Sequence, residues 1–302
     1  MRRLVFVHGI NNEDFTPEQI ETDWKNALHS GIGDRANEWW NNVEVRTAYY
    51  ADVLAKETNA WGRAEPAGVR MGAEAPDADY VEDSIAELYL ELQRAYEIDN
   101  NTVSLELDDS DEPKFARRMA AGVHKKWLKA ITRALEKIVP SAGHGLAGIF
   151  LEQAAAYLNK PGLYEKINAL VEDQVLQDFS NLDNTVVVGH SLGTVVMYSL
   201  LRATSSEEKI PQFVTLGSPL GIQIVRKRIG PPFIKPEIVK SWTNGADPED
   251  FVALHPKLDA QTFGPAKITN YSELNNGQED AHSVRRYLSQ PEIAGVIYEA
   301  LK

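Results

Sequence analysis

One serine lies in a local sequence that could make it a nucleophile. Ser191 stands in the run Gly189-His190-Ser191-Leu192-Gly193, after the β-branched run 185–188 and before a helix expected from about 192 to 202. Such a strand-to-helix turn holds the serine in a tight backbone geometry and exposes its hydroxyl, while side chains at the two glycines would collide with neighbouring elements. The pattern therefore predicts a nucleophilic Ser191. The alternative is a glycine-bounded turn without chemistry.

A serine hydroxyl needs a general base, and the base needs an acid that orients it. Around a turn of this kind the acid and then the histidine follow the serine, each after a later strand. His282 follows an expected strand at 266–270 and a polar loop, which suits the base. A surface or helix-start position is the alternative for it. His255, beside Pro256, is interpreted as a loop histidine.

The acid is expected in the loop that follows a strand at 238–242. This loop offers Asp247 and Asp250. Asp250 leads into the apolar turn 251–253, which would bury its carboxyl group near the histidine, whereas Asp247 precedes a proline and is typical of a turn. We therefore favour Asp250, and Asp247 stays open as the alternative.

The N-terminal strand supplies the remaining part of the site. The apolar run 4–7 ends at His8-Gly9-Ile10. A strand that ends in this way beside the serine turn can place a backbone amide where an oxyanion develops, so the amides of Ile10 and Leu192 are the expected donors. The side chain of His8 is interpreted as packed and structural.

These segments need a scaffold that gathers them at one edge of a sheet. Apolar or β-rich runs at 4–7, 43–50, 185–188, 213–216, 238–242 and 266–270 alternate with helix-length segments. Buried strands separated by helices are typical of parallel sheets that are covered on both faces. We predict an α/β fold with a doubly wound, mostly parallel sheet of about six strands. Thr16, Pro17 and Gln19 form the start signal of a helix that should end near Gly31.

The middle of the chain has helical periodicity instead. We predict helices at 80–97, 113–139, 146–158 and 162–179, after an irregular stretch at 55–79. This segment is longer than an ordinary crossover between strands. We therefore predict a helical cap at 55–179 inserted into a core formed by 1–54 and 180–302.

Charge in the predicted cap falls into two blocks. Residues 74–112 hold fourteen acidic side chains and one basic one, and residues 113–139 hold eight basic side chains and one acidic one. We favour packing of the basic helix 113–139 against the acidic helix 80–97. The alternatives are that 113–139 lies on a membrane surface or binds an acidic partner.

Taken together, these motifs resemble those of the α/β-hydrolase superfamily, in particular its lipase- and esterase-type members. The matching residues are Val7-His8-Gly9, Gly189 to Gly193, Gly217-Ser218-Pro219-Leu220, Asp250-Phe251-Val252-Ala253 and His282. The resemblance covers 1–53 and 183–302. Where the superfamily commonly has Asp-Pro-Val-Ala, this chain has Phe251 in place of the proline. The resemblance implies a serine esterase that acts on a lipid-like or other apolar acyl compound through an acyl-enzyme. An amidase or peptidase, or a partner-binding module on the same scaffold, is the alternative.

The amino-acid composition excludes several other kinds of functional site and partner. The 302 residues include no cysteine, which excludes disulfides, thiolate metal sites and a cysteine nucleophile. The net charge of −13 disfavours nucleic acid as a partner. No targeting segment or membrane-spanning run is recognised, so we expect a cytoplasmic enzyme. The motifs call for no metal or organic cofactor, and oligomeric state and substrate-binding residues stay unassigned.

Overall fold

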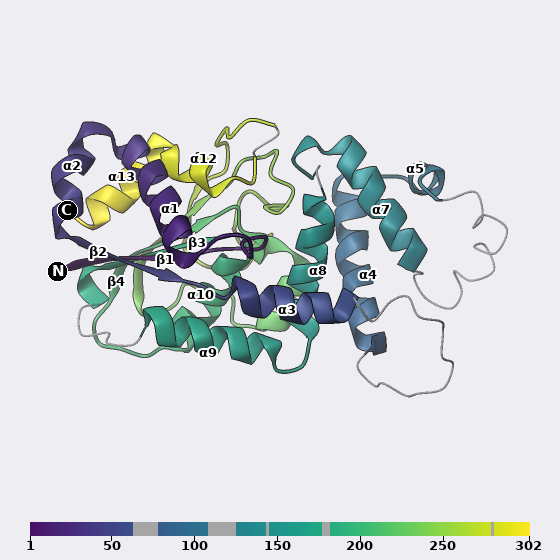
Figure 1. Ribbon diagram of the computed structural model, residues 1–302, viewed down its shortest axis with the longest axis horizontal. Coiled ribbons are helices and arrows are strands. Elements are labelled where there is room, and N and C mark those ends of the chain that lie inside the picture. The colour runs from purple at the N-terminus through teal and green to yellow at the C-terminus, as the bar shows by residue number, and fades with distance from the viewer. Residues whose placement is uncertain (63–77, 108–124, 143–144, 177–181, 279–280) are drawn as a thin grey trace.

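The chain folds around one parallel sheet. A computed structural model describes residues 1–302 except 63–77, 108–124, 143–144, 177–181 and 279–280 (Figure 1). Six parallel strands pair in the order β2-β1-β3-β4-β5-β6. They are β1 (Arg2–Val7), β2 (Val43–Ala48), β3 (Thr185–His190), β4 (Ile210–Leu216), β5 (Val239–Gly245) and β6 (Thr269–Tyr271). The predicted α/β class and six-stranded parallel sheet are confirmed, although the last strand begins three residues later than expected.

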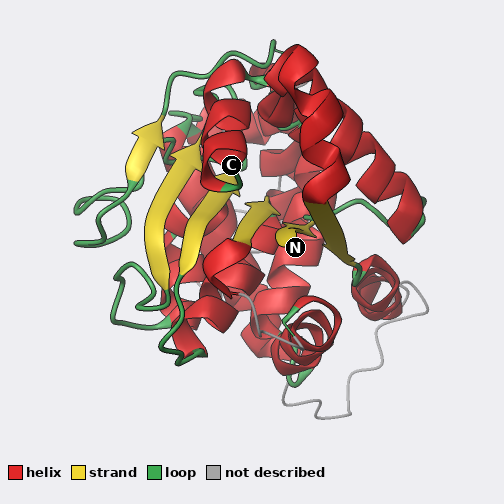
Figure 2. Ribbon diagram, turned by 90° about the vertical axis from the view of Figure 1, so that its left-hand side faces the viewer, coloured by secondary structure: helices red, strands yellow, loops and turns green. Residues whose placement is uncertain are grey.

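Helices cover both faces of this sheet (Figure 2). One face packs against α1 (Pro17–Ile32), α2 (Ala36–Trp39), α12 (Val284–Ser289) and α13 (Pro291–Ala300). The other packs against α9 (Leu163–Val175), α10 (Leu192–Ala203) and α11 (Gln223–Ile229). Alternation along β1 explains the two layers, because Leu4 and Phe6 enter one core cluster while Val5 and Val7 enter the other.

The expected start signal of the first helix is confirmed. Thr16 Oγ1 accepts a hydrogen bond from the Gln19 amide, and Gln19 Oε1 accepts one from the Thr16 amide. The reciprocal bonds satisfy two backbone donors at the start of α1. This fixes where the chain leaves the loop after β1 and begins to cover the sheet.

The other helices in the described part of the chain are α3 (Ala51–Gly62), α4 (Ala78–Ala95), α5 (Asn100–Leu105), α7 (Lys125–Ile138) and α8 (Leu146–Asn159). In Figure 1, α4, α5 and α7 lie at the end of the molecule opposite the N-terminus. Short 3-10 turns occur at Gly33–Arg35, Trp40–Asn42, Pro140–Ala142, Leu182–Asn184 and Pro219–Gly221. The prediction of irregular structure from 55 was wrong up to Gly62, because α3 continues that far; 63–77 lie outside the described residues.

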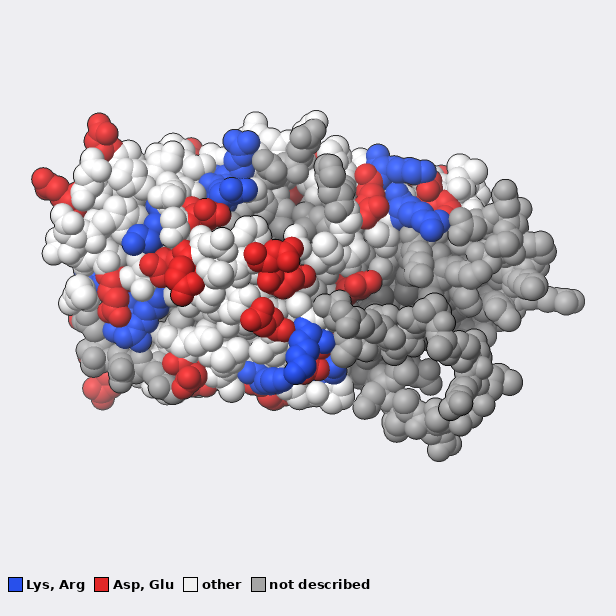
Figure 3. Space-filling view, in the orientation of Figure 1, with Lys and Arg blue, Asp and Glu red and all other residues white. Residues whose placement is uncertain are grey.

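The basic helix packs against the acidic one over the part that the structure describes. α7 contacts α4 and buries Ile131 and Leu135, and Thr132 donates a hydrogen bond to the Tyr89 hydroxyl at 3.2 Å. On the face that Figure 3 shows, acidic and basic side chains of the described residues are interspersed. Residues 113–124 of the predicted basic helix lie outside the described residues.

The predicted domain boundaries stay a prediction. α9 falls within the predicted cap, and it packs against β2 and α10. None of the described helices combines the length and apolar character needed to cross a membrane.

The strand order places a topological switch point between the ends of β1 and β3. The chain leaves β1 for β2 on one side, whereas β3 pairs with β1 on the other side. In open α/β sheets, ligands bind at the carboxyl ends of the strands where the connections diverge in this way. The residues after Val7 and after His190 therefore share the position at which a site is expected.

Candidate active site

Ser191 forms the turn between β3 and α10. Its backbone angles are φ 54° and ψ −129°, in a region that costs a non-glycine residue about 1–3 kcal/mol. The Ser191 amide donates to the Leu216 carbonyl at 3.0 Å, and the Thr194 hydroxyl donates to the Ser191 carbonyl at 2.7 Å. Surrounding bonds thus hold the strained conformation in place.

Three glycines allow the main chain to close around this serine. A Cβ atom at Gly189 would lie 3.0 Å from the Gly193 carbonyl oxygen. At Gly9 it would lie 2.3 Å from Ser191 Cβ, and at Gly193 it would lie 2.2 Å from the Val7 carbonyl oxygen. The predicted need for glycine at 189 and 193 is confirmed. A side chain at 193 would collide with the backbone at the end of β1.

Gly193→Ala is expected to lower the free energy of unfolding by at least about 1–3 kcal/mol, because the methyl group would overlap rigid backbone of β1. Urea unfolding measures the change. Gly295→Ala is the matched control, since it also lies in a helix but has no atom within 4 Å of the new Cβ. It should stabilise by up to about 1 kcal/mol. Equal effects of the two substitutions would contradict the interpretation.

Asp250 and His282 are in direct contact at the carboxyl end of the sheet. His282 Nδ1 lies 2.9 Å from both carboxylate oxygens of Asp250, and Asp250 is 1% exposed. Because a carboxylate only accepts, Nδ1 carries the proton and Nε2 is left as an acceptor. This is the tautomer that a general base requires.

Asp250 has other donors besides the imidazole. Its oxygens accept hydrogen bonds from the Val252 amide at 2.9 Å and from the Tyr287 hydroxyl at 2.7 Å. Burial, with the charge of Asp250 next in importance, raises the pKa of Tyr287 well above its ordinary value, so the phenol stays a donor. The carboxylate is therefore fixed in both position and orientation.

Ser191 Oγ and His282 Nε2 are both buried, and neither has a hydrogen-bond partner among the described residues. The structure therefore brings Asp250 to His282 but shows no bond from His282 to the serine. In ligand-free sites such bonds are often long and tighten only when substrate binds. The link between the two groups is His190, which precedes Ser191 in the chain and whose ring packs against that of His282 in a tilted arrangement, with centroids 4.6 Å apart.

The two alternatives from the sequence lie elsewhere. Asp247 accepts hydrogen bonds from the backbone amides of Glu249 at 2.8 Å and Asn276 at 2.5 Å, so it shapes the loop rather than contacting His282. His255 Nε2 lies 3.5 Å from a carboxylate oxygen of Glu91 in α4.

The loop after β1 is held from several sides. The Asn12 side chain donates to the Ile10 carbonyl at 2.6 Å, and the Asn11 amide donates to Gln153 Oε1 of α8 at 3.0 Å. Leu192 opens α10, where the first amides have no partner inside the helix. The predicted donors, Ile10 and Leu192, thus belong to two backbone segments that meet beside Ser191.

His8 is packed, as expected, and has a defined tautomer. The Tyr50 amide donates to His8 Nε2 at 3.1 Å, so His8 Nδ1 carries the proton and donates to the Gly9 carbonyl at 2.7 Å. The ring stacks on Tyr50 with centroids 4.3 Å apart. Burial lowers the pKa of His8 to about 4. Its side chain therefore fixes the peptide that precedes Ile10.

The low pKa of His8 makes stability depend on pH. In the unfolded chain His8 takes up a proton below about pH 6.5, whereas in the folded protein it does so only near pH 4. The free energy of unfolding should therefore fall as the pH is lowered from about 6.5 to about 4, by up to about 3 kcal/mol. Urea unfolding between pH 7 and pH 4 measures the slope. His8→Gln should give a shallower slope, and an unchanged slope would contradict this origin.

A pocket of about 300 Å³ adjoins the histidines. His190, His282 and Ile10 line it together with residues of the loop after β1, of α1 and of the start of α12: Asn11, Asn12, Phe15, Ile20, Asp23, Trp24, Ser283, Val284 and Arg285. Ser191 itself is buried and does not line this pocket, but its neighbour His190 does. Its lining combines an apolar wall with polar and charged side chains, and small-molecule sites commonly join these two kinds of surface.

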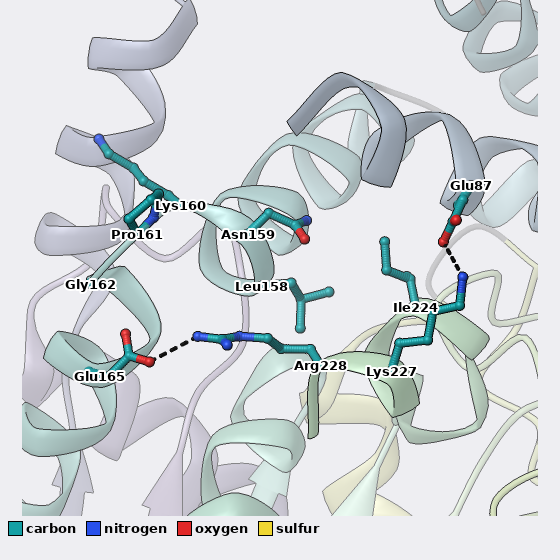
Figure 4. A pocket seen from close by; sticks show the side chains of 10 residues that line it. All are labelled: Glu87, Leu158, Asn159, Lys160, Pro161, Gly162, Glu165, Ile224, Lys227 and Arg228. Atoms are coloured by element: carbon teal, nitrogen blue, oxygen red, sulfur yellow. Dashed lines mark hydrogen bonds and ion pairs between the residues drawn. The ribbon is translucent and has the colours of Figure 1, made fainter. Parts of the chain in front are cut away.

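A larger pocket, of about 620 Å³, lies between α4, α8, α9 and α11 (Figure 4). Ion pairs line it, with Glu165 and Arg228 at 3.0 Å and Glu87 and Lys227 at 2.7 Å. It contains none of the residues that the sequence assigns to chemistry. We therefore place the candidate site in the smaller pocket.

Helical residues from the predicted cap contact the loop that carries Asp250. Ser141 donates a hydrogen bond to the Glu249 carbonyl, and the rings of Phe150 and Phe251 meet edge to face with centroids 5.7 Å apart. Together with the bond between Gln153 and Asn11, these contacts join α8 and its preceding turn to the loops around the serine.

Three residues of this site were missed in the sequence: Tyr287, His190 and Gln153. A polar side chain at the end of an apolar strand was a signal for His190. The other two are defined by contacts between distant segments and had no local signal. In the described parts of the chain, no group of three or more histidine, aspartate or glutamate side chains is placed to hold a metal ion.

No family model matches this chain, and no curated protein or solved structure matches it either. Its chemistry must therefore be inferred from the arrangement of its own side chains.

Proposed function

We propose that the protein is a serine hydrolase of the α/β-hydrolase type that cleaves an ester or related acyl bond through an acyl-enzyme. The observation that carries the proposal is the buried Asp250–His282 pair, which the contacts of His190 connect to the strained turn of Ser191. Such strain persists where the surrounding structure holds it, and it is concentrated at active sites.

The proposed reaction has two halves, the acylation of Ser191 and the hydrolysis of the acyl-enzyme. As Ser191 Oγ bonds to the substrate carbonyl carbon, His282 Nε2 takes the hydroxyl proton and Asp250 stabilises the charged imidazole. The carbonyl oxygen becomes an oxyanion that accepts hydrogen bonds from the amides of Ile10 and Leu192. The bond to the leaving group then breaks, and the leaving oxygen takes the proton from His282.

Water completes the cycle. His282 takes a proton from a water molecule as its oxygen attacks the acyl carbon, and the proton returns to Ser191 Oγ as the acid leaves. The mechanism calls for no metal or organic cofactor. A lipid-like or other apolar acyl substrate is supported by the apolar wall of the site, which Phe15, Ile20 and Trp24 contribute.

A fluorophosphonate probe tests the reaction type, because it phosphonylates only an activated serine. The folded protein should be labelled, and mass spectrometry of the digested protein should place the added mass on the peptide that contains Ser191. A folded protein that stays unlabelled, or is labelled elsewhere, would overturn the proposal. p-Nitrophenyl esters of increasing acyl length, with matched p-nitroanilides, then separate esterase from amidase activity and define the acyl group.

A further inference from the structure

The histidine next to the serine is built into the site. His190 ends β3, and its ring is buried. Its Nε2 lies 2.9 Å from the backbone carbonyl oxygen of His282. Because a carbonyl only accepts, His190 Nε2 carries a proton and donates it. The side chain of His190 therefore connects the residue that precedes Ser191 to the backbone of His282, the proposed base.

Aromatic ring contacts also hold His190 and His282 against each other. The imidazoles of His190 and His282 lie 4.6 Å apart at an interplanar angle of 36°. Trp24 meets His190 edge-on at 6.2 Å, and Tyr287 lies 6.2 Å away on another side. His190 is thus enclosed by α1, α12 and the loop that carries His282, and it has little freedom to rotate.

The environment also keeps His190 uncharged. Burial is the main cause that lowers its pKa well below the ordinary value, and the nearby His282 and His8 act in the same direction. Asp250 and Tyr287 are the other titratable groups packed around this pair. His190 is therefore a fixed neutral donor, and it places no second positive charge beside His282 when that residue takes up a proton.

We propose that His190 is a positioning residue, which holds His282 chiefly through the hydrogen bond to its backbone carbonyl, with the ring contact secondary, so that Nε2 faces Ser191. The role rests on the proposed function, in which His282 is the base. His190 neither contacts the reacting atoms nor exchanges a proton. It acts by restricting the backbone and ring of His282.

Two substitutions separate the hydrogen bond from the ring contact. His190→Gln retains an N–H donor at about the position of Nε2, whereas His190→Phe retains a ring but has no donor. The loss of one hydrogen bond corresponds to about a tenfold change. We therefore expect His190→Phe to lower kcat and the rate of fluorophosphonate labelling about tenfold with little change in KM, and His190→Gln to restore most of the loss.

A second readout does not depend on activity. The Nδ1 proton of His282, which is bonded to Asp250, should give a low-field proton NMR signal in the wild type and in His190→Gln that is lost or broadened in His190→Phe. Urea unfolding checks that both variants fold. The positioning role is overturned if His190→Phe behaves as the wild type in both readouts. It is also overturned if His190→Gln is as impaired as His190→Phe in both. If the wild type is not labelled but the NMR pattern is as expected, the role stands and the hydrolase proposal fails.

Discussion

Ser191→Ala is expected to abolish fluorophosphonate labelling and to lower kcat for ester hydrolysis by about 10⁶-fold, the scale of loss when a catalytic serine is removed. The reason is that Oγ forms the covalent bond in the proposed reaction, and nothing else in the turn replaces it. Ser191 Oγ is also a buried hydroxyl without a partner in the described structure. Its removal should therefore leave the free energy of unfolding unchanged or raise it by about 1 kcal/mol.

The matched control is Ser199→Ala, about two helical turns further along α10. Its hydroxyl donates to the Val195 carbonyl at 2.8 Å and takes no part in the proposed reaction. Labelling and ester hydrolysis should persist in this variant. If Ser191→Ala is still labelled at the wild-type rate, another residue is the nucleophile and the assignment of Ser191 is wrong.

Asp250→Asn is expected to lower kcat by about 10⁴-fold, as the corresponding change does in serine proteases. The asparagine side chain keeps one acceptor but gains an N–H₂ group. That group would face donors, because His282 Nδ1, the Tyr287 hydroxyl and the Val252 amide all point at the present carboxylate. The imidazole would then favour the tautomer with its proton on Nε2, which cannot accept the proton of Ser191.

Asp247→Asn is the control for this prediction. Asp247 accepts one backbone hydrogen bond from Glu249 in the same loop and one from Asn276 in the loop after β6, and no hydrogen bond joins it to His282 among the described residues. The substitution should lower the free energy of unfolding and leave kcat much less affected than Asp250→Asn does. Steady-state hydrolysis of a p-nitrophenyl ester and urea unfolding measure the two effects. A larger loss of kcat in Asp247→Asn would exchange the roles of the two aspartates.

Much of the scaffold could be predicted because its signals are local. Wholly apolar runs mark the buried strands, and glycines at 189 and 193 mark the turn that Ser191 occupies. The capping box at Thr16 identifies the start of α1 to the residue. The choice of Asp250 over Asp247 also came from a local feature, the apolar turn that follows it, and the contact with His282 agrees with that choice.

Other parts of the structure depend on tertiary contacts and were not predictable from pattern. α12 has only six residues, and its Tyr287 gains its place by bonding to Asp250 and to the Asp247 amide. Gln153 looks like an ordinary residue of an apolar helix, yet its oxygen meets the Asn11 amide in another part of the chain. The spacing of residues along the sequence does not indicate which distant segments will pair in this way.

Gly9 packs closely against Ser191, and Gly193 packs closely against the end of β1. This packing has a consequence for how the protein folds. β1 occupies a place between β2 and β3, and Arg3 pairs with Thr185 far along the chain. Closing so long a loop is entropically costly, so this pairing should form late in folding. The serine turn cannot close before it. During refolding, covalent labelling should therefore return after the helical circular dichroism signal, and partly folded chains should carry an inert serine.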